Sequence, residues 1–109
     1  MVHYYNAPMA ENVWMRDEEH AFMADLGSVF SGRLRDALRE TAELLALDYV
    51  GIDAAIDREG KLLIFEADNA LIVHLLDDPV MYAYKHQYVP RIYAALDALV
   101  RRRIAESIV

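Results

Sequence analysis

The chain has 109 residues, 56% of them hydrophobic, which fits one small domain with its own core, residues 1–109. Its formal net charge of −7 argues against a nucleic-acid partner, because such surfaces normally present clustered Lys and Arg. The lack of cysteine excludes a disulfide framework and a thiolate zinc site. We find neither a signal-peptide pattern nor an apolar run long enough for a membrane, so we expect a cytoplasmic protein with no membrane partner.

The N-terminal segment Val2–Asn6 is aromatic and β-prone and predicts a short strand. Pro8 cannot donate to a β-ladder, so we expect the strand to end before it. The following residues, 12–16, predict a loop in which Trp14 is anchored on the core.

Two helices are predicted next. The first covers 17–26, where the acidic residues 17–19 complement the positive end of the helix dipole and Gly27 is placed to stop the helix. The second covers 31–46 and has Ser31 as its N-cap. Its apolar face recurs at helical spacing and consists of Leu34, Leu38, Thr41, Ala42 and Leu45. We expect this second helix to lie across one face of a sheet.

The stretch 48–69 predicts a β-hairpin with strands over 49–57 and 61–68. Glu59-Gly60 supplies a two-residue turn, which makes Arg58 and Lys61 the closing pair. Counting outward from the turn pairs Asp57 with Leu62, Ala55 with Ile64, and Asp53 with Glu66.

Three carboxylates of this hairpin, those of Asp53, Glu66 and Asp68, are predicted to project from one face, because side chains alternate along a strand. Like charges that face each other destabilise a sheet, so this cluster needs protons, cationic side chains or a metal ion beside it. Hard divalent cations such as Mg²⁺ prefer oxygen ligands of this kind. We expect the face that bears this cluster, opposite the helix, to be left for a ligand or for another protein segment.

The C-terminal part predicts further helices. The apolar run Ala70–Leu76 predicts a strand or an extended segment, and a short helix is expected over 80–84. Pro90 suits the first turn of a longer helix over 90–104, whose predicted buried face is formed by Ile92, Tyr93, Leu96, Leu99, Val100 and Ile104. The run Arg101–Arg103 either complements the C-terminal dipole of this helix, which we prefer, or binds phosphate.

The hairpin motifs Gly-Ile-Asp at Gly51–Asp53 and Phe-Glu-Ala-Asp-Asn at Phe65–Asn69 resemble the C-terminal part of the ATP-grasp superfamily. In that superfamily a strand with an Asp is followed by a strand that ends in Glu-x-Asn. The position of the family's Asn is occupied here by Asp68, and Asn69 follows one residue later. Val2–Ala7 and the segment that ends at His74 resemble the branch that often carries tetratricopeptide repeats.

This resemblance implies a fold and a set of ligands. The fold is α+β, a small antiparallel sheet packed on helices, equivalent to half of an ATP-grasp module. The cofactors are Mg²⁺ (or Mn²⁺) and ATP, and the implied metal ligands are Asp53, Glu66, Asp68 and Asn69. The parent family contains ATP-dependent carboxylate-amine or carboxylate-thiol ligases.

The same resemblance implies an incomplete site. The chain has two lysines, Lys61 and Lys85, and neither lies in a glycine-rich loop that would clamp phosphates. We therefore expect no catalysis by the chain alone, which needs the missing N-terminal half or a second copy in a homodimer. A segment of a longer protein and a degenerate stand-alone protein are both open. A non-catalytic structural or oligomerisation domain, with its carboxylates neutralised by protein cations, is the alternative function.

Overall fold

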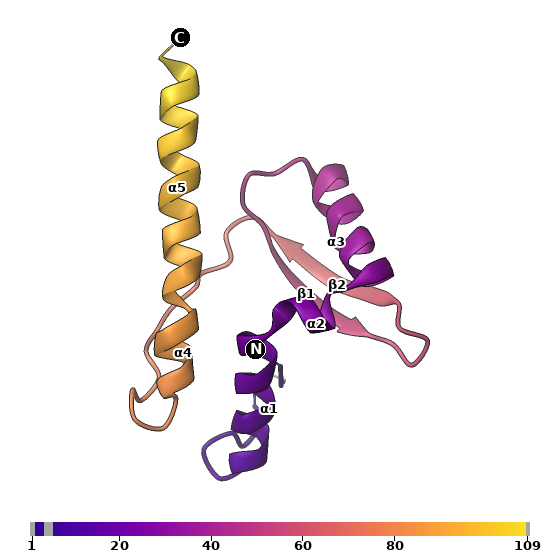
Figure 1. The fold of residues 1–109 in the computed structure, drawn as a ribbon, viewed down its shortest axis with the longest axis vertical. Coiled ribbons are helices and arrows are strands. Elements are labelled where there is room, and N and C mark those ends of the chain that lie inside the picture. Colours follow the sequence, from indigo (N-terminus) through magenta and orange to yellow (C-terminus); the bar gives the residue numbers. More distant parts are fainter. Residues whose placement is uncertain (1, 4–5, 109) are drawn as a thin grey trace. The chain divides into compact units, whose positions relative to one another are not determined.

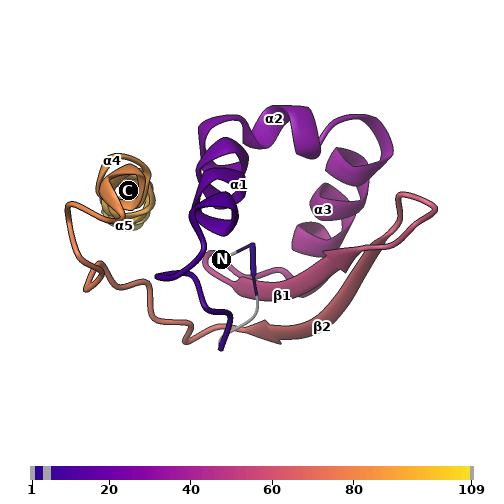
Figure 2. The ribbon, with the colours of Figure 1, turned by 90° about the horizontal axis from the view of Figure 1, so that it is seen from below.

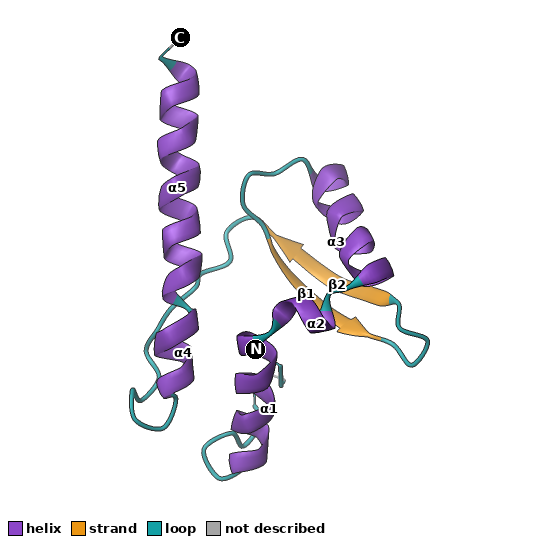
Figure 3. Ribbon diagram, in the orientation of Figure 1, coloured by secondary structure: helices purple, strands orange, loops and turns teal. Residues whose placement is uncertain are grey.

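The computed structural model describes residues 2–3 and 6–108 and has a mixed α+β fold (Figures 1 and 3). In chain order its elements are α1 (Val13–Ala24), α2 (Leu26–Val29), α3 (Gly32–Leu45), β1 (Gly51–Ile56), β2 (Leu62–Asp68), α4 (Ala83–Tyr88) and α5 (Pro90–Ser107). They group into two compact units, 1–26 with 73–109 and 27–72. In the described part of the chain, no helix has the length and apolar character needed to cross a membrane.

The unit 27–72 is a helix on a hairpin. Strands β1 and β2 pair in antiparallel fashion, and α3 packs along one face of the pair, as predicted (Figures 1 and 2). Ser31 is the N-cap residue of α3, although its hydroxyl bonds the carbonyl of Ser28 and not the helix. The half-buried side chains of α3 include Leu34, Leu38, Thr41 and Leu45, and only Ala42 of the predicted face is exposed.

The turn of the hairpin is one residue longer than predicted. Asp57 and Lys61 close it, because the Asp57 amide donates to the Lys61 carbonyl over 2.9 Å. The Asp57 carboxylate accepts from the amides of Glu59 and Lys61, and Gly60 takes the left-handed φ of 75° that a three-residue loop of this kind requires. The predicted closing pair Arg58–Lys61 was wrong because the side chain of Asp57 stabilises the longer loop.

A β-bulge then restores part of the predicted register. Near the turn, Leu62 lies opposite Ile56 rather than Asp57, and Ile64 lies opposite Ala54 rather than Ala55. The register shifts at the next step, where Phe65 has no partner on β1. Beyond the bulge, Asp53 lies opposite Glu66, as predicted. The longer turn and the bulge therefore cancel.

The chain after β2 folds back over the start of β1. A Cβ atom at Gly51 would overlap the side chain of Leu71, so Leu71 packs directly on the bare glycine backbone. The Tyr49 hydroxyl donates to the Leu71 carbonyl over 2.6 Å and fixes this segment. Residues 71–76 form no strand, so the first of the two predicted alternatives is wrong.

The other unit contains α1, which begins earlier than predicted. Asn12 is its N-cap residue and nothing in 13–16 breaks a helix, so the predicted loop is helical. The acidic residues 17–19 consequently lie beyond the first turn of the helix, where the dipole effect has faded. The helix ends at Ala24, and Gly27 lies within α2 rather than stopping α1.

The N-terminal predictions have mixed outcomes. Trp14 is not anchored on a core, because it is 60% exposed and stands edge-on to the ring of His3 with 5.6 Å between centroids. The predicted strand over 2–6 includes residues 4 and 5, which lie outside the described residues.

Helix α4 begins one turn later than predicted, at Ala83. The carboxylate of Asp78 accepts from the amides of Val80 and Met81, and its carbonyl accepts from Tyr82. These bonds hold a turn over 78–82, so the helix starts after it.

Helix α5 begins at Pro90 as predicted but continues to Ser107 (Figure 1). Its predicted buried face is wrong: Leu99 is half-buried, and the other predicted members are exposed, namely Ile92, Tyr93, Leu96, Val100 and Ile104. The preferred role for Arg101–Arg103 is also wrong, because they do not lie in the last turn. They form intrahelical ion pairs with Asp97 and Glu106 instead.

The contact between Gly51 and Leu71 gives a test of the unit 27–72. Gly51→Ala should lower the free energy of unfolding by about 1–3 kcal/mol, the usual cost of forcing extra volume into a packed contact. The measurement is urea unfolding followed by far-UV circular dichroism, since the only tryptophan, Trp14, belongs to the other unit. In a Leu71→Gly background the same substitution should cost less, and an undiminished cost would contradict the assigned contact.

Candidate functional site

The pair Asp53 and Glu66 forms the centre of the predicted metal site. The two residues lie directly opposite each other on β1 and β2, and both are exposed. Directly paired residues share a face of the sheet, so their carboxylates project from the same side. In the part of the chain that the structure describes, no ion pair involves either group.

Asp68 is less available than the first two carboxylates. It lies on the same face by strand alternation, opposite Gly51, and is half-buried at the point where Leu71 folds over the sheet. Its Oδ1 accepts a hydrogen bond from the Ala70 amide over 2.7 Å. Asn69 follows in the turn after β2 and is exposed.

The described residues contain no cluster of three or more His, Cys, Asp or Glu side chains that could by themselves enclose a metal ion. What the hairpin offers is a pair of carboxylates, which suits Mg²⁺ better than a metal held entirely by protein. Magnesium is commonly bound through one or two carboxylates, with water and substrate phosphates completing its octahedral shell. The chemistry of Asp53 and Glu66 therefore fits a magnesium ion that is shared with a phosphate ligand.

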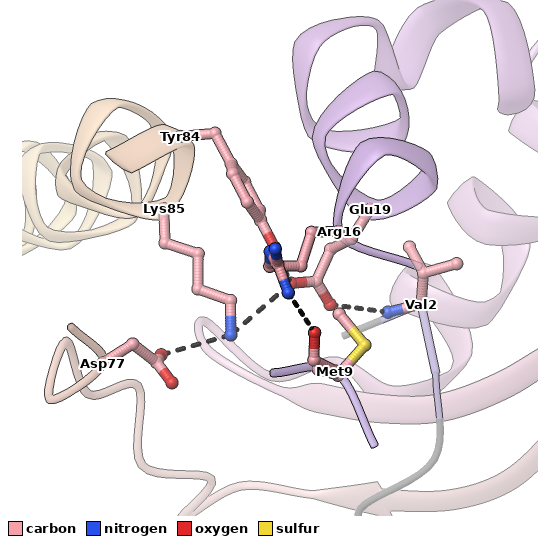
Figure 4. Close-up of polar contacts among 7 residues, drawn as sticks. All are labelled: Val2, Met9, Arg16, Glu19, Asp77, Tyr84 and Lys85. Atoms are coloured by element: carbon pink, nitrogen blue, oxygen red, sulfur yellow. Dashed lines mark hydrogen bonds and ion pairs between the residues drawn. The ribbon is translucent and has the colours of Figure 1, made fainter. Parts of the chain in front are cut away.

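A second polar site lies in the other unit, around Glu19 of α1 (Figure 4). This side chain is only 1% exposed. Its Oε1 accepts from the Tyr84 hydroxyl over 3.0 Å and lies 3.4 Å from the Lys85 ammonium, while its Oε2 accepts from the Val2 amide over 3.2 Å. One carboxylate thus ties the N-terminal segment to α1 and α4.

The ammonium of Lys85 is also fully engaged. It forms a second ion pair with Asp77 over 3.1 Å and lies 4.7 Å from the centroid of the Tyr82 ring. The imidazole of His86, the next residue, contacts the Asp77 carbonyl over 3.1 Å. This cluster therefore has a structural role. Its lysine is held between two carboxylates and an aromatic ring, so its ammonium is not available to a ligand.

Burial, together with the hydrogen bond to Glu19, strongly raises the pKa of the Tyr84 hydroxyl. The hydroxyl therefore remains a neutral donor to the carboxylate at physiological pH. The Tyr84 ring is stacked on His20, with 5.2 Å between centroids and 14° between planes. Stacking and hydrogen bonding together explain why Tyr84 is one of the two most buried apolar side chains among the described residues, the other being Val89.

Sequence reasoning missed the role of Glu19 because it treated the run 17–19 as the start of a helix. The signal that could have found it is helical spacing. Glu19 is four residues from Met15 and from Met23 and three from Phe22, so it lies on the apolar face of α1. A charged residue on such a face requires a buried partner.

Comparison with protein-family models, curated proteins and solved structures finds no match for the chain. The ATP-grasp relationship therefore stays a prediction from the hairpin motifs.

Removal of the buried carboxylate gives a test of the second site. Glu19→Ala should lower the free energy of unfolding by about 3 kcal/mol, because it leaves Lys85, whose side chain is 12% exposed, with one of its two anionic partners missing. Fluorescence of Trp14, which is on the same helix, reports the transition. Asp17→Ala, on the exposed side of α1, should stay within about 0.5 kcal/mol of the wild type. Equal effects of the two substitutions would contradict the role assigned to Glu19.

Proposed function

We propose that the exposed face of the hairpin binds Mg²⁺ or Mn²⁺ together with the phosphates of a nucleotide, as the C-terminal half of an ATP-grasp module would. The observation that supports this most directly is the cross-strand pair of Asp53 and Glu66. Two like charges facing each other are unfavourable without a cation, and neither carboxylate forms an ion pair in the described part of the chain. A divalent ion would remove this repulsion.

In this proposal the hairpin supplies the metal ligands, and the missing N-terminal half or a second copy of the chain supplies the other parts of the site. Asp53 and Glu66 would hold the ion, Asp68 or Asn69 would complete the protein's share, and the ion would neutralise phosphate charge. A phosphate clamp of lysines is the missing component. Lys85 is held by Glu19 and Asp77, and Lys61 closes the hairpin turn. The chain alone would therefore bind without catalysing transfer, in a cytoplasmic setting where ATP is present.

A second candidate is a structural or oligomerisation domain. It is favoured by the large number of exposed apolar side chains, since Tyr84 and Val89 are the only apolar side chains that are buried among the described residues. In this candidate, cationic side chains of the protein would neutralise the hairpin carboxylates. The exposed, unpaired state of Asp53 and Glu66 in the described structure gives that form no support.

Metal binding predicts a gain of stability that depends on the pair. Millimolar Mn²⁺ should raise the melting temperature of the wild type, since a ligand at ten times its Kd stabilises by about 1.4 kcal/mol. Asp53→Asn should keep or raise the stability without metal, because it relieves repulsion, and should weaken the response to Mn²⁺. The measurement is thermal unfolding by circular dichroism with and without the ion.

Glu43→Gln is the matched control, because it removes one exposed carboxylate from α3 in the same unit. It should respond to Mn²⁺ like the wild type. An equal response of the Asp53 variant would place the ion elsewhere. A loss of about 3–5 kcal/mol in that variant without metal would instead indicate a buried ion pair and favour the structural candidate.

The half-module proposal also predicts that the isolated chain neither hydrolyses ATP nor ligates substrates with Mg²⁺ present. The physical reason is the lack of a phosphate clamp, since Lys85 is engaged in ion pairs. Phosphate release from purified chain is the measurement. Hydrolysis that disappears in Glu66→Gln but survives in Glu43→Gln would show a complete site and overturn the half-module.

A further inference from the structure

The backbone nitrogen of Val2 lies beside Glu19, which is the only buried charged residue in the described part of the chain. It donates to Oε2 of Glu19 over 3.2 Å, and no other hydrogen bond to that oxygen is found among the described residues (Figure 4). The other oxygen, Oε1, accepts from Tyr84 and lies 3.4 Å from the ammonium of Lys85. Oε2 therefore depends on the Val2 nitrogen to compensate for its lost hydration.

The ion pair that Glu19 forms with Lys85 is shared with a second carboxylate. Lys85 also contacts Asp77, and that contact is the shorter of the two, at 3.1 Å against 3.4 Å. The guanidinium of Arg16, which is labelled beside Glu19 in Figure 4, donates to two backbone carbonyls of the preceding turn. A buried carboxylate whose ion pair is shared in this way would be stabilised by a further positive charge.

We propose that the Met1–Val2 peptide bond is hydrolysed after translation and that the α-ammonium of Val2 then forms an ion pair with Glu19. Water adds across the bond, so methionine leaves with the new carboxyl group, and the nitrogen of Val2 becomes an amine that takes up a proton near neutral pH. Peptidases that remove an N-terminal methionine accept a small second residue such as valine. The inference applies to a chain translated from Met1 and does not rest on the nucleotide proposal.

The nitrogen of Val2 is held at the place where the ammonium would pair. The next residue, His3, lies with its Nε2 atom 3.1 Å from Oε2 of Glu18, and its ring stands edge-on to Trp14. Both partners belong to α1, as Glu19 does, so the N-terminal segment is anchored on one helix by adjacent contacts. Val2 itself is 36% exposed, so water can hydrate the N–H groups of the ammonium that Glu19 does not bind.

The first experiment measures the intact mass of the chain, expressed from a Met1 codon in a host that contains a methionine aminopeptidase. We expect a mass that is lower than that of the 109-residue chain by one methionine residue. Val2→Leu is the control, because a bulky second residue blocks the peptidase, and this variant should keep Met1. A wild-type chain that keeps Met1 would overturn the proposal.

The second experiment compares two forms of the same chain, with and without Met1. The form with Met1 is purified from cells in which the peptidase is inhibited, and treatment with purified peptidase yields the other form. In urea unfolding at about pH 6, followed by Trp14 fluorescence, the form that begins at Val2 should have a folding equilibrium constant about tenfold larger. Pairing with Glu19 raises the pKa of the α-amine on folding. The advantage is therefore complete below the ordinary pKa of the amine and is lost as the pH rises through the folded-state pKa, toward about pH 10.

The other ionisable groups around this contact titrate in both forms, so their effects cancel when the two forms are compared at the same pH. In the described structure these groups are His3 of the N-terminal segment, Arg16, Glu18 and His20 of α1, Asp77 of the segment before α4, and Tyr84 and Lys85 of α4. The pH dependence of the difference between the two wild-type forms thus tests the contact without a substitution.

Two substitutions then assign the difference to Glu19. Glu19→Gln removes the charge with which the ammonium would pair, so the two forms of this variant should be equally stable. Glu18→Gln is the matched control, because it removes a neighbouring exposed carboxylate of the same helix, and it should keep the difference. Equal stability of the two wild-type forms, a difference that does not change with pH, or one that persists in Glu19→Gln would overturn the proposed ion pair.

Discussion

The unit that contains α1, α4 and α5 depends on the buried carboxylate of Glu19, which has a polar partner at both of its oxygens. Glu19 is almost completely removed from solvent, yet a hydroxyl, an ammonium and a backbone amide each compensate part of its lost hydration. These partners come from separate parts of the chain, so satisfying one charge also brings the N-terminal segment and α4 to α1. Lys85 forms ion pairs with Glu19 and Asp77, so one of the two lysines of the chain has a structural role.

In the unit 27–72 the equivalent constraint is backbone geometry. The side chain of Asp57 stabilises a three-residue turn, and this alone would shift every cross-strand pair by one position. The bulge at Phe65 shifts the register back before the carboxylates are reached. Bulges are often found where a strand must re-aim side chains near a functional site. The facing of Asp53 and Glu66 is thus the outcome of two local irregularities that compensate each other.

The sequence by itself determined the elements whose signals are local. Alternation and turn residues predicted the hairpin, Ser31 and the apolar spacing predicted α3, and Pro90 marked the start of α5. The pairing of Asp53 with Glu66 was also predicted, although through a register that was wrong near the turn. The metal role of these residues stays a prediction, because periodicity places carboxylates on a face without showing what they bind.

Only the tertiary structure decided where each surface is covered. Leu96 and Val100 of α5 were predicted from their spacing to be buried, but they are exposed in the structure. Glu19 is adjacent to two other acidic residues in the sequence, and it is buried because Tyr84 and Lys85 approach from a segment about 65 residues away. Spacing along the chain fixes which side chains share a face, whereas burial depends on which distant segment packs against that face.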